Sequence, residues 1–538
     1  MPRHRRMIEL QTARNGRPTA VLRGRALHST YDPDREALRF VERAVSTPPG
    51  TLVLLGAGLG YVSEEIRRRY PRTRIVAIYY EAEIHAQAWH RPPETWHPGS
   101  DLDLGSFLRA TVGELDLEGL QVLEWEPSAR ACEAQSREAN RTVLRHVNEV
   151  NASSVTTLAF GRLWIRNCIA NYVCGSAPLA ALPLPADRGA LIAASGPSLE
   201  PLVPVLREVR SRATLVALPS ALPLLFHAGL PPDLVVVTDP GFYTGIHTRE
   251  LERAAIPVVM PLSAYRGLCS SSCPVHYLRQ PLGFEEELLD AGRTPATRVP
   301  AFGTVAATAL HLILRFLRGP AVFAGLDLGY DDVVSHARPN AFELWLRLDS
   351  RCTRPFHHLS FARAVDSSTR EGPSRARTSR ALTTYREWFA SLPPADRERT
   401  LRLSPPEGLP AVPGVRVIRP RELQTLFPAA GPPPPLPPVC QSHPLRTARL
   451  AQVRRLLDGY RGLVTDAEGS GLAASPRLLS LAGVLAPREL LTVKRALRLH
   501  GKAQEETRLL LDGLAAILDG LAARIADEGA PDGLESAP

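Results

Sequence analysis

The sequence predicts an α/β protein with a Rossmann-like parallel-sheet N-terminal domain, a central parallel-sheet domain and an all-helical C-terminal region. Two observations predict this fold class. Short uncharged apolar runs alternate with helical patterns in two separate stretches, as expected of parallel strands that are covered on both faces. The residues after 443 show only helical periodicity. We expect an N-terminal domain with a helical connector at 1–175, a central domain at 176–426, a proline-rich linker at 427–440 and a helical region at 441–530.

The first predicted β-α-β unit contains TLVLLGAGLG at 51–60 and RIVAIYYEAE at 74–83, with a helical stretch between them. Glu81 closes the second strand, where an acid can hold ribose hydroxyls, and the glycine turn lets a ligand approach a helix N-terminus. The glycines of this turn are Gly56, Gly58 and Gly60. Their G-x-G-x-G spacing departs from the G-x-G-x-x-G of dinucleotide sites, and it favours strand–helix packing alone over a second nucleotide site.

A helix is predicted over 143–172. Its residues Asn167 and Asn171 are four apart and therefore share one helix face. We expect the two side chains to cap, or to bridge to, the next domain.

The central stretch alternates strands and helices, as an open parallel sheet requires. The expected strands are 189–195, 214–218, 233–239, 256–260, 275–278 and 321–330, and the expected helices are 199–209, 219–230 and 303–317. Ligands of such sheets lie beyond the carboxyl ends of the strands. The polar residues that this rule gathers on one edge are Ser195 to Ser198, Ser220, Asp239, Gly303, Thr304, and Asp327 with the loop to His336.

The segment Ser195-Gly196-Pro197-Ser198 lies between a buried strand and a helix, so its N–H groups and the helix dipole favour a phosphate. Gly196 permits close approach, and Pro197 suits a first helical turn. The alternative is a capping turn without a ligand. Because other polar strand ends converge on the same edge, we favour a phosphate or nucleotide site with Ser220, Thr304 and Asp327 as further contacts.

Asp239 and Asp327 both end apolar strands, where a carboxylate is costly unless it is paired, hydrated or bound to a ligand. They could bind Mg²⁺, hold a ribose, orient a base or cap a loop. His336 has a side chain able to act as a base near neutral pH. Its neighbour Arg338 could face a carboxylate or a phosphate.

Composition limits the partners. The 538 residues carry 64 basic and 55 acidic side chains, a net charge of +9 that would usually suggest nucleic acid or an anionic membrane. However, only Lys494 and Lys502 are lysines, and the arginines are spread among acids. We therefore expect no nucleic-acid partner.

The seven cysteines include no C-x-x-C pair and no zinc-like spacing, which indicates a reducing compartment. The basic N-terminus has no apolar segment behind it, and no window approaches the ~20 apolar residues of a membrane helix. We expect a cytoplasmic protein without a membrane span.

The predicted linker at 427–440 is rich in proline, which favours a semi-rigid spacer over a ligand for a partner domain. In the helical region beyond it, DGLAA recurs at 512 and 519. The apolar stripe there comprises Leu514, Ile517, Leu518 and Leu521. So short a repeat favours an intramolecular seam, with oligomerisation through these helices as the alternative.

Several ordered motifs resemble the bacterial motility-associated factor (Maf) proteins and their 6-hydroxymethylpterin diphosphokinase MptE-like domain. They are ASGPSLEPLVPVL, AGLPPDLVVVTDP, GTVAATAL and AGLDLGY with SHARPNAFE, and VLLGAGLGY and FGRLWIRNCIANY resemble the N-terminal portion of that family. The resemblance covers roughly residues 50 to 425. It implies a central domain similar to bacterial sialyltransferases, which transfers a nonulosonic acid from a CMP-activated donor to Ser or Thr of flagellin or another surface protein.

By this resemblance, Gly196, Pro197 and Ser198 cradle the CMP phosphate, Asp239 lies at the donor edge, and Asp327 lies with His336 near the sugar. No cofactor is then required beyond the CMP-sugar substrate, although Asp239 could hold Mg²⁺. The sequence departs from the family at Leu218 and Pro219, where polar residues are usual.

Two alternatives stay open. A diphosphokinase would use ATP, with Mg²⁺ on Asp239 and Asp327. A flagellar or envelope accessory protein would have no activity of its own.

Overall fold

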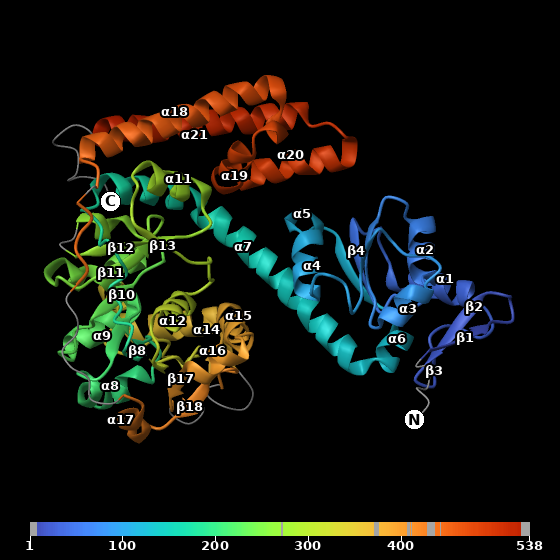
Figure 1. Cartoon of the computed structure of the whole chain (residues 1–538), viewed down its shortest axis with the longest axis horizontal. Coiled ribbons are helices and arrows are strands. Elements are labelled where there is room, and N and C mark those ends of the chain that lie inside the picture. The colour runs from blue at the N-terminus through green and yellow to red at the C-terminus, as the bar shows by residue number, and fades with distance from the viewer. Residues whose placement is uncertain are drawn as a thin grey trace. The chain divides into compact units, whose positions relative to one another are not determined.

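The computed structural model describes residues 8–270, 273–370, 376–405, 409, 411–427, 436–441 and 443–528. The chain divides into two compact units, Met1–Ala159 with Pro487–Glu506, and Phe160–Ala486 with Thr507–Pro538. Helix α7 (Glu133–Cys174) contributes residues to both units, so the chain passes from one to the other within one helix (Figure 1). The predicted fold class is confirmed, because both units contain parallel sheets and the C-terminal region is helical.

The first unit contains a four-stranded parallel sheet in the order β6-β5-β4-β7. Its strands are β4 (Thr51–Leu55), β5 (Arg74–Ile78), β6 (Glu94–Trp96) and β7 (Leu120–Glu124). Its helices are α1 (Pro33–Ala44), α2 (Tyr61–Arg69), α3 (Ala82–Gln87), α4 (Leu104–Thr111), α5 (Glu114–Leu117) and α6 (Glu126–Ala131). A small antiparallel sheet of β1 (Ile8–Thr12), β2 (Pro18–Leu22) and β3 (Arg25–Ala26) precedes them.

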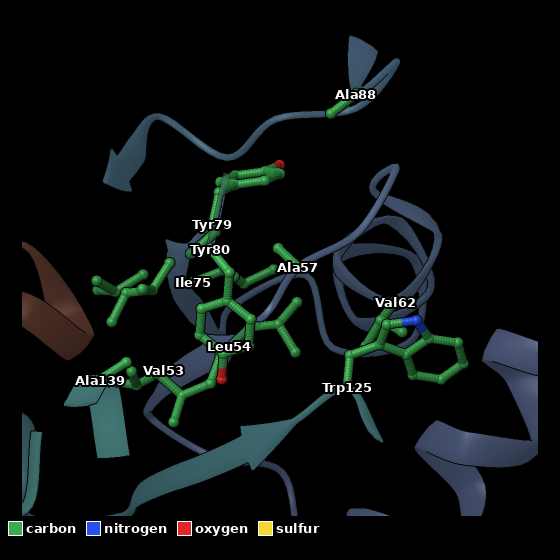
Figure 2. Packing of buried hydrophobic residues seen from close by; sticks show 14 of the residues in the cluster. Val53, Leu54, Ala57, Val62, Ile75, Tyr79, Tyr80, Ala88, Trp125 and Ala139 are labelled. Atoms are coloured by element: carbon green, nitrogen blue, oxygen red, sulfur yellow. The ribbon is translucent and has the colours of Figure 1, made fainter. Parts of the chain in front are cut away.

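The core of the first unit forms around β4, whose five residues TLVLL are all buried. Figure 2 shows Val53 and Leu54 of this strand with Tyr79 and Tyr80, which follow β5. The strand β5 ends at Ile78, so Glu81 does not close it as predicted but forms the N-cap of α3.

A C-terminal helix, α20 (Pro487–His500), also belongs to the first unit. Its Arg498 donates to Asp116 Oδ1 at 3.0 Å and to Thr51 Oγ1 at 2.8 Å. These contacts attach the helix to the start of β4 and to α5.

The second unit contains a nine-stranded parallel sheet in the order β13-β12-β11-β10-β9-β8-β14-β17-β18. The strands are β8 (Ala190–Ala193), β9 (Thr214–Ala217), β10 (Leu234–Val236), β11 (Val258–Pro261), β12 (Val275–Arg279), β13 (Ala296–Arg298), β14 (Ala321–Ala324), β17 (Thr400–Leu403) and β18 (Arg416–Ile418). From β8 the chain builds strand after strand to β13 on one side and then returns to β14 on the other. The order therefore reverses between β8 and β14, which is where open α/β sheets bind ligands.

Helices connect these strands. They are α8 (Leu199–Val209), α9 (Leu222–His227), α10 (Phe242–Thr248), α11 (Gly283–Ala291), α12 (Val305–Phe316), α15 (Arg380–Ala390), α16 (Pro394–Arg399) and α17 (Leu423–Leu426). Between β14 and β17 the chain also forms a hairpin of α13 (Ala341–Asp349) and α14 (Phe356–Ser367), followed by the short pair β15 (Thr369–Arg370) and β16 (Arg377–Thr378).

The remaining helices are α18 (Arg446–Ser470), α19 (Pro476–Leu485) and α21 (Gln504–Glu528), and α18 lies beside α21 (Figure 1). Of the predicted stripe, Leu514, Leu518 and Leu521 are buried within the single chain and Ile517 is half-buried, as an intramolecular seam predicts. Glu287 of α11 accepts hydrogen bonds from Tyr460 at 2.9 Å and Arg477 at 2.6 Å, which attach α18 and α19 to the central sheet. Most of the predicted proline linker, 428–435, lies outside the described residues.

Within the described ranges, no helix has both the length and the apolar character needed to cross a bilayer.

Candidate functional site

The turn after β8 is joined to the turn after β14 by a buried pair, Ser198 and Asp327. The Ser198 backbone N–H donates to Asp327 Oδ2 at 2.7 Å, and its hydroxyl donates to Oδ1 at 2.5 Å. Gly196 donates its N–H to Gly325 O at 2.8 Å. A Cβ on Gly196 would lie 2.4 Å from Asp327 Oδ2, so only glycine allows the two turns to approach this closely.

This pairing revises the role predicted for Gly196 and Ser198. The N–H groups that the sequence offered to a phosphate already bind Gly325 and Asp327, so a phosphate at α8 would compete with a carboxylate. Burial raises the pKa of Asp327, which the hydrogen bonds from Ser198 and the charge of Arg402 oppose. Asp327 thus holds the two turns of the switch point together rather than facing solvent.

Arg402 of β17 supports this pair from the neighbouring strand, and sequence reasoning missed it. Its guanidinium is buried and donates to Leu326 O at 3.0 Å. Burial lowers the pKa of Arg402, and the negative charge of Asp327 opposes that shift. A single arginine within a strand pattern gave no signal of this role.

Two serine hydroxyls meet at the ends of β8 and β9. Ser220 Oγ donates to Ser195 Oγ at 2.7 Å, and both residues are half-buried. The loop that carries His336 lies beside them, because Ala337 N donates to Ser195 O at 2.8 Å. The structure therefore brings Ser195, Ser220 and the His336 loop together, as the sequence predicts.

His336 itself is half-buried, and its ring centre lies 4.7 Å from that of Phe342. Its Nδ1 is 2.8 Å from Ser335 Oγ. Burial, with smaller contributions from the charges of His247 and Arg363, lowers the pKa of His336 to about 3. This shift makes His336 a weaker base than an ordinary histidine and leaves its ring neutral at physiological pH, so its role as a proton acceptor stays a prediction.

Arg338 beside it is engaged within the protein. Its Nε donates to Glu343 Oε1 at 2.5 Å, and its backbone N–H donates to Glu200 at 3.3 Å.

Asp239 is the exposed carboxylate of this edge. Its Oδ1 accepts from Gly241 N at 2.8 Å, and its backbone carbonyl accepts from Tyr265 N at 3.1 Å. Tyr385 of α15 faces the same region: burial raises the pKa of its phenol, and the charge of Asp239 raises it further. Sequence reasoning missed Tyr385, because its helix is distant in the chain from the strand ends.

Helix α12 begins at the same edge. Thr304 is its N-cap, and Thr304 Oγ1 accepts from Ala306 N at 3.3 Å. The preceding Gly303 is exposed, and a Cβ built on it would lie 4.0 Å from Tyr385 Cε1. Gly303, Thr304, Tyr385 and Asp239 therefore belong to one group at this edge.

The strands that carry these residues are adjacent in the sheet order β10-β9-β8-β14. Asp239, Ser220, Ser195 and Asp327 follow these strands in that order. Three interstrand steps of about 4.8 Å give the edge a width of about 14 Å. That width suits an elongated ligand such as a nucleotide joined to a second group.

Asn167 and Asn171 of α7 hold the loops of this edge, as the bridging interpretation predicts. Asn171 Nδ2 donates to Leu262 O at 2.8 Å and to Ala264 O at 2.9 Å. Asn167 Nδ2 donates to Pro240 O and to Ser263 O, both at 3.2 Å. The asparagine pair thereby fixes the backbone that follows β10 and β11, including the residue after Asp239.

The glycine turn of the first unit is filled by protein side chains. A Cβ on Gly56 would lie 2.8 Å from Tyr80 and one on Gly58 would lie 2.5 Å from His28, whose Nε2 accepts from Leu59 N at 2.9 Å. A Cβ on Gly60 would meet the backbone carbonyl of His90. These contacts match the packing alternative for this turn.

Glu81, the predicted ribose ligand of that turn, is also engaged within the protein. It accepts from Arg23 at 2.6 Å and from Gln135 at 3.2 Å.

A protein-bound metal needs several oxygen, nitrogen or sulfur ligands in one place. Within the described part of the chain, no three His, Cys, Asp or Glu side chains gather as metal ligands do. Both oxygens of Asp327 accept hydrogen bonds from Ser198, which leaves Asp239 as the accessible carboxylate of the edge. The two carboxylates therefore do not form the Mg²⁺ site that the diphosphokinase alternative places on Asp239 and Asp327.

The fold and this edge define a parallel α/β protein with a candidate ligand site at its topological switch point. Residues 167–333 match the family model of the 6-hydroxymethylpterin diphosphokinase MptE-like domain. The solved structure of the MAf glycosyltransferase from Magnetospirillum magneticum AMB-1 aligns over 97% of this chain and 92% of its own, with a TM-score of 0.53 and 13% identity. These findings support the Maf/MptE-like assignment that the sequence motifs predicted.

Two uncharacterized proteins of Treponema pallidum (strain Nichols) are also similar. One is 26% identical over 324 residues, which span 59% of this chain and 66% of that relative, just under two thirds. The other is 29% identical over 224 residues, which span 38% of this chain and 74% of that relative.

Proposed function

We propose that this chain is a glycosyltransferase that moves a nonulosonic acid from a CMP-activated donor to a Ser or Thr hydroxyl of flagellin or another surface protein. The observation that carries the proposal is the nearly full-length fold similarity to a Maf glycosyltransferase. The polar edge from β10 to β14 supports it, because it offers hydroxyls, a helix N-terminus and one exposed carboxylate over a width that suits a CMP-sugar.

The donor phosphate is assigned to the centre of this edge. The hydroxyls of Ser195 and Ser220 lie there, and the N-terminus of α12 at Thr304 supplies a positive helix end. Asp239, at the β10 end, is assigned to the ribose hydroxyls. The phenol of Tyr385 keeps its proton because its pKa is raised, so it is a hydrogen-bond donor to the departing phosphate.

The reaction forms a bond between the acceptor oxygen and the anomeric carbon and breaks the bond from that carbon to the phosphate oxygen. CMP leaves with the bonding electrons, and the acceptor hydroxyl releases its proton. His336 is assigned as the proton acceptor. Because its pKa is low, it receives the proton late, when carbon–oxygen bond formation has made the acceptor hydroxyl strongly acidic.

The description of the matched family model favours a second candidate, transfer of pyrophosphate from ATP with Mg²⁺. That reaction needs a divalent cation between carboxylates and phosphates. The engagement of Asp327 by Ser198 argues against it.

The test measures the release of CMP from CMP-pseudaminic or CMP-legionaminic acid. The reaction contains EDTA, and chromatography quantifies the CMP. The proposal expects release by the wild type, loss with Asp239→Ala, and no loss with Asp187→Ala. Asp187 is a matched control because its side chain is 90% exposed and it precedes β8, at the opposite edge of the sheet. Cleavage of ATP with Mg²⁺ but not of either CMP-sugar would overturn the proposal in favour of the diphosphokinase.

A further inference from the structure

An apolar surface lies beside the candidate site on three helices, α10, α13 and α14. The large apolar side chains exposed there, called the aromatic patch below, are Phe242, Tyr243, Leu344, Trp345, Leu348, Phe361 and Val365. Leu348 is 73% exposed, and Phe242 and Phe361 are each 59% exposed. Contiguous exposed apolar surface of this kind marks interaction sites, whereas single exposed apolar residues do not.

The patch is held together by ring contacts that lead to His336. Phe242 packs edge-on against Trp345, with ring centres 5.4 Å apart, and Tyr243 lies 4.9 Å from Phe342. Phe342 in turn lies 4.7 Å from His336. The exposed rings are therefore continuous, through one half-buried phenylalanine, with the residue assigned as proton acceptor.

The segment that carries most of the patch also has an excess of positive charge. The segment 338–370 has six arginines and three acidic residues. The guanidinium of Arg363 lies over the rings of Phe342 and Tyr243, at 4.5 and 5.7 Å from their centres. That of Arg347 lies 4.4 Å from the centre of the Phe356 ring. Among the described residues, the ion pair found within this segment joins Arg338 to Glu343 and involves neither Arg347 nor Arg363.

We propose that the aromatic patch binds an acidic segment of the protein acceptor and presents its hydroxyl group to His336. The inference rests on the proposed glycosyltransferase function. Charge complementarity selects an acidic partner, and it disfavours a second copy of this chain, whose identical patch would bring like charges together. The patch combines exposed aromatic residues with arginines, and aromatic residues and arginine are the types that contribute most of the binding energy at protein interfaces.

An anionic membrane is a less suitable partner, because membrane-surface helices keep their cations on the face opposite the apolar one. Here Arg363 lies on the aromatic rings themselves.

The test is the dissociation constant for purified, unglycosylated flagellin from the same genome, measured with the full chain by calorimetry. Leu348→Asp and Trp345→Ala are each expected to weaken binding at least about tenfold. Leu445→Asp is the matched control, because Leu445 is 79% exposed, undergoes the same change and lies outside the patch. Circular dichroism and urea midpoints verify that the variants are folded.

The outcomes separate the two proposals. Release of CMP from the donor with water in place of the protein acceptor reports on donor binding and cleavage, whereas flagellin binding reports on the patch, so either can fail alone. Flagellin that does not bind the wild type, or that binds both patch variants like the wild type, overturns the docking proposal. The docking proposal is also overturned if the wild type is a dimer that only the patch substitutions dissociate. It is overturned as well if the patch binds phosphatidylserine vesicles and not flagellin.

Discussion

The substitution Gly196→Ala tests the switch-point pair most sharply, because it adds one methyl group where two turns touch. The new Cβ would lie 2.4 Å from Asp327 Oδ2 and 2.5 Å from Gly325 O. Neither oxygen can move freely: Gly325 O accepts the N–H of residue 196 itself, and Asp327 is held by two hydrogen bonds from Ser198. Relief of the clash must therefore separate the turn after β8 from the turn after β14.

The size of the effect follows from these contacts. Overpacking of a core costs about 1–3 kcal/mol. Loss of a hydrogen bond to a charged acceptor costs about 1.5–3 kcal/mol. Together they give an expected loss of about 2.5–6 kcal/mol in the free energy of unfolding, a large fraction of the roughly 5–15 kcal/mol that stabilises a typical domain.

The assay is equilibrium unfolding in urea, followed by circular dichroism, with Gly459→Ala as control. Gly459 is exposed within α18 and a Cβ there meets nothing within 4 Å, so the same change should stabilise that helix by up to about 1 kcal/mol. A Gly196→Ala variant that unfolds at the wild-type urea concentration would refute the pairing of Ser198 with Asp327.

Three further predictions concern other parts of the chain. Burial lowers the pKa of His28 to about 3 and that of His247 to about 4, so the folded protein favours their neutral forms. The stability that the neutral forms confer is present above about pH 6.5 and is lost as the pH falls toward 4 for His247 and toward 3 for His28. At pH 5 each histidine should lower the free energy of unfolding by about 2 kcal/mol relative to neutral pH, which urea unfolding across that range measures; a flat profile would contradict it. Asn171→Leu leaves two buried carbonyls without their donor and should cost about 2–4 kcal/mol in the same assay, whereas an unchanged midpoint would remove Asn171 from the support of the edge. Gly58→Ala should lower the unfolding midpoint of the first unit, because its Cβ would lie 2.5 Å from His28, but leave CMP binding unchanged in a titration; lost CMP binding would restore a ligand role to that turn.

The sequence was sufficient to predict both sheets and the edge where polar residues gather. Uncharged runs such as those of β8 and β14 have few alternatives to buried parallel strands, and the switch-point rule then places Ser195, Ser220 and Asp239 on one edge. Local pattern was enough here because each of these residues directly follows its own strand.

The contacts between distant residues could not be predicted in this way. Ser198 and Asp327 are 129 positions apart, so the sequence around Ser198 does not show that its N–H, at the start of α8, is hydrogen-bonded to a carboxylate. The glycines of the first unit pose the same problem, because the side chain that fills the space at Gly58 comes from His28. The low pKa of His336 likewise depends on burial against Phe342, which the composition of its loop does not reveal.

The most direct test of the central claim is calorimetric titration of the full chain with CMP in EDTA and, separately, with ATP and Mg²⁺. The proposed site predicts that CMP binds without metal, that Asp239→Ala weakens this binding at least about tenfold, and that Asp187→Ala leaves it unchanged. At about 100 times its dissociation constant, CMP should also add about 2.7 kcal/mol of stability. No binding of CMP, or binding of ATP with Mg²⁺ alone, would contradict the assignment of the β10 to β14 edge to a CMP-activated donor.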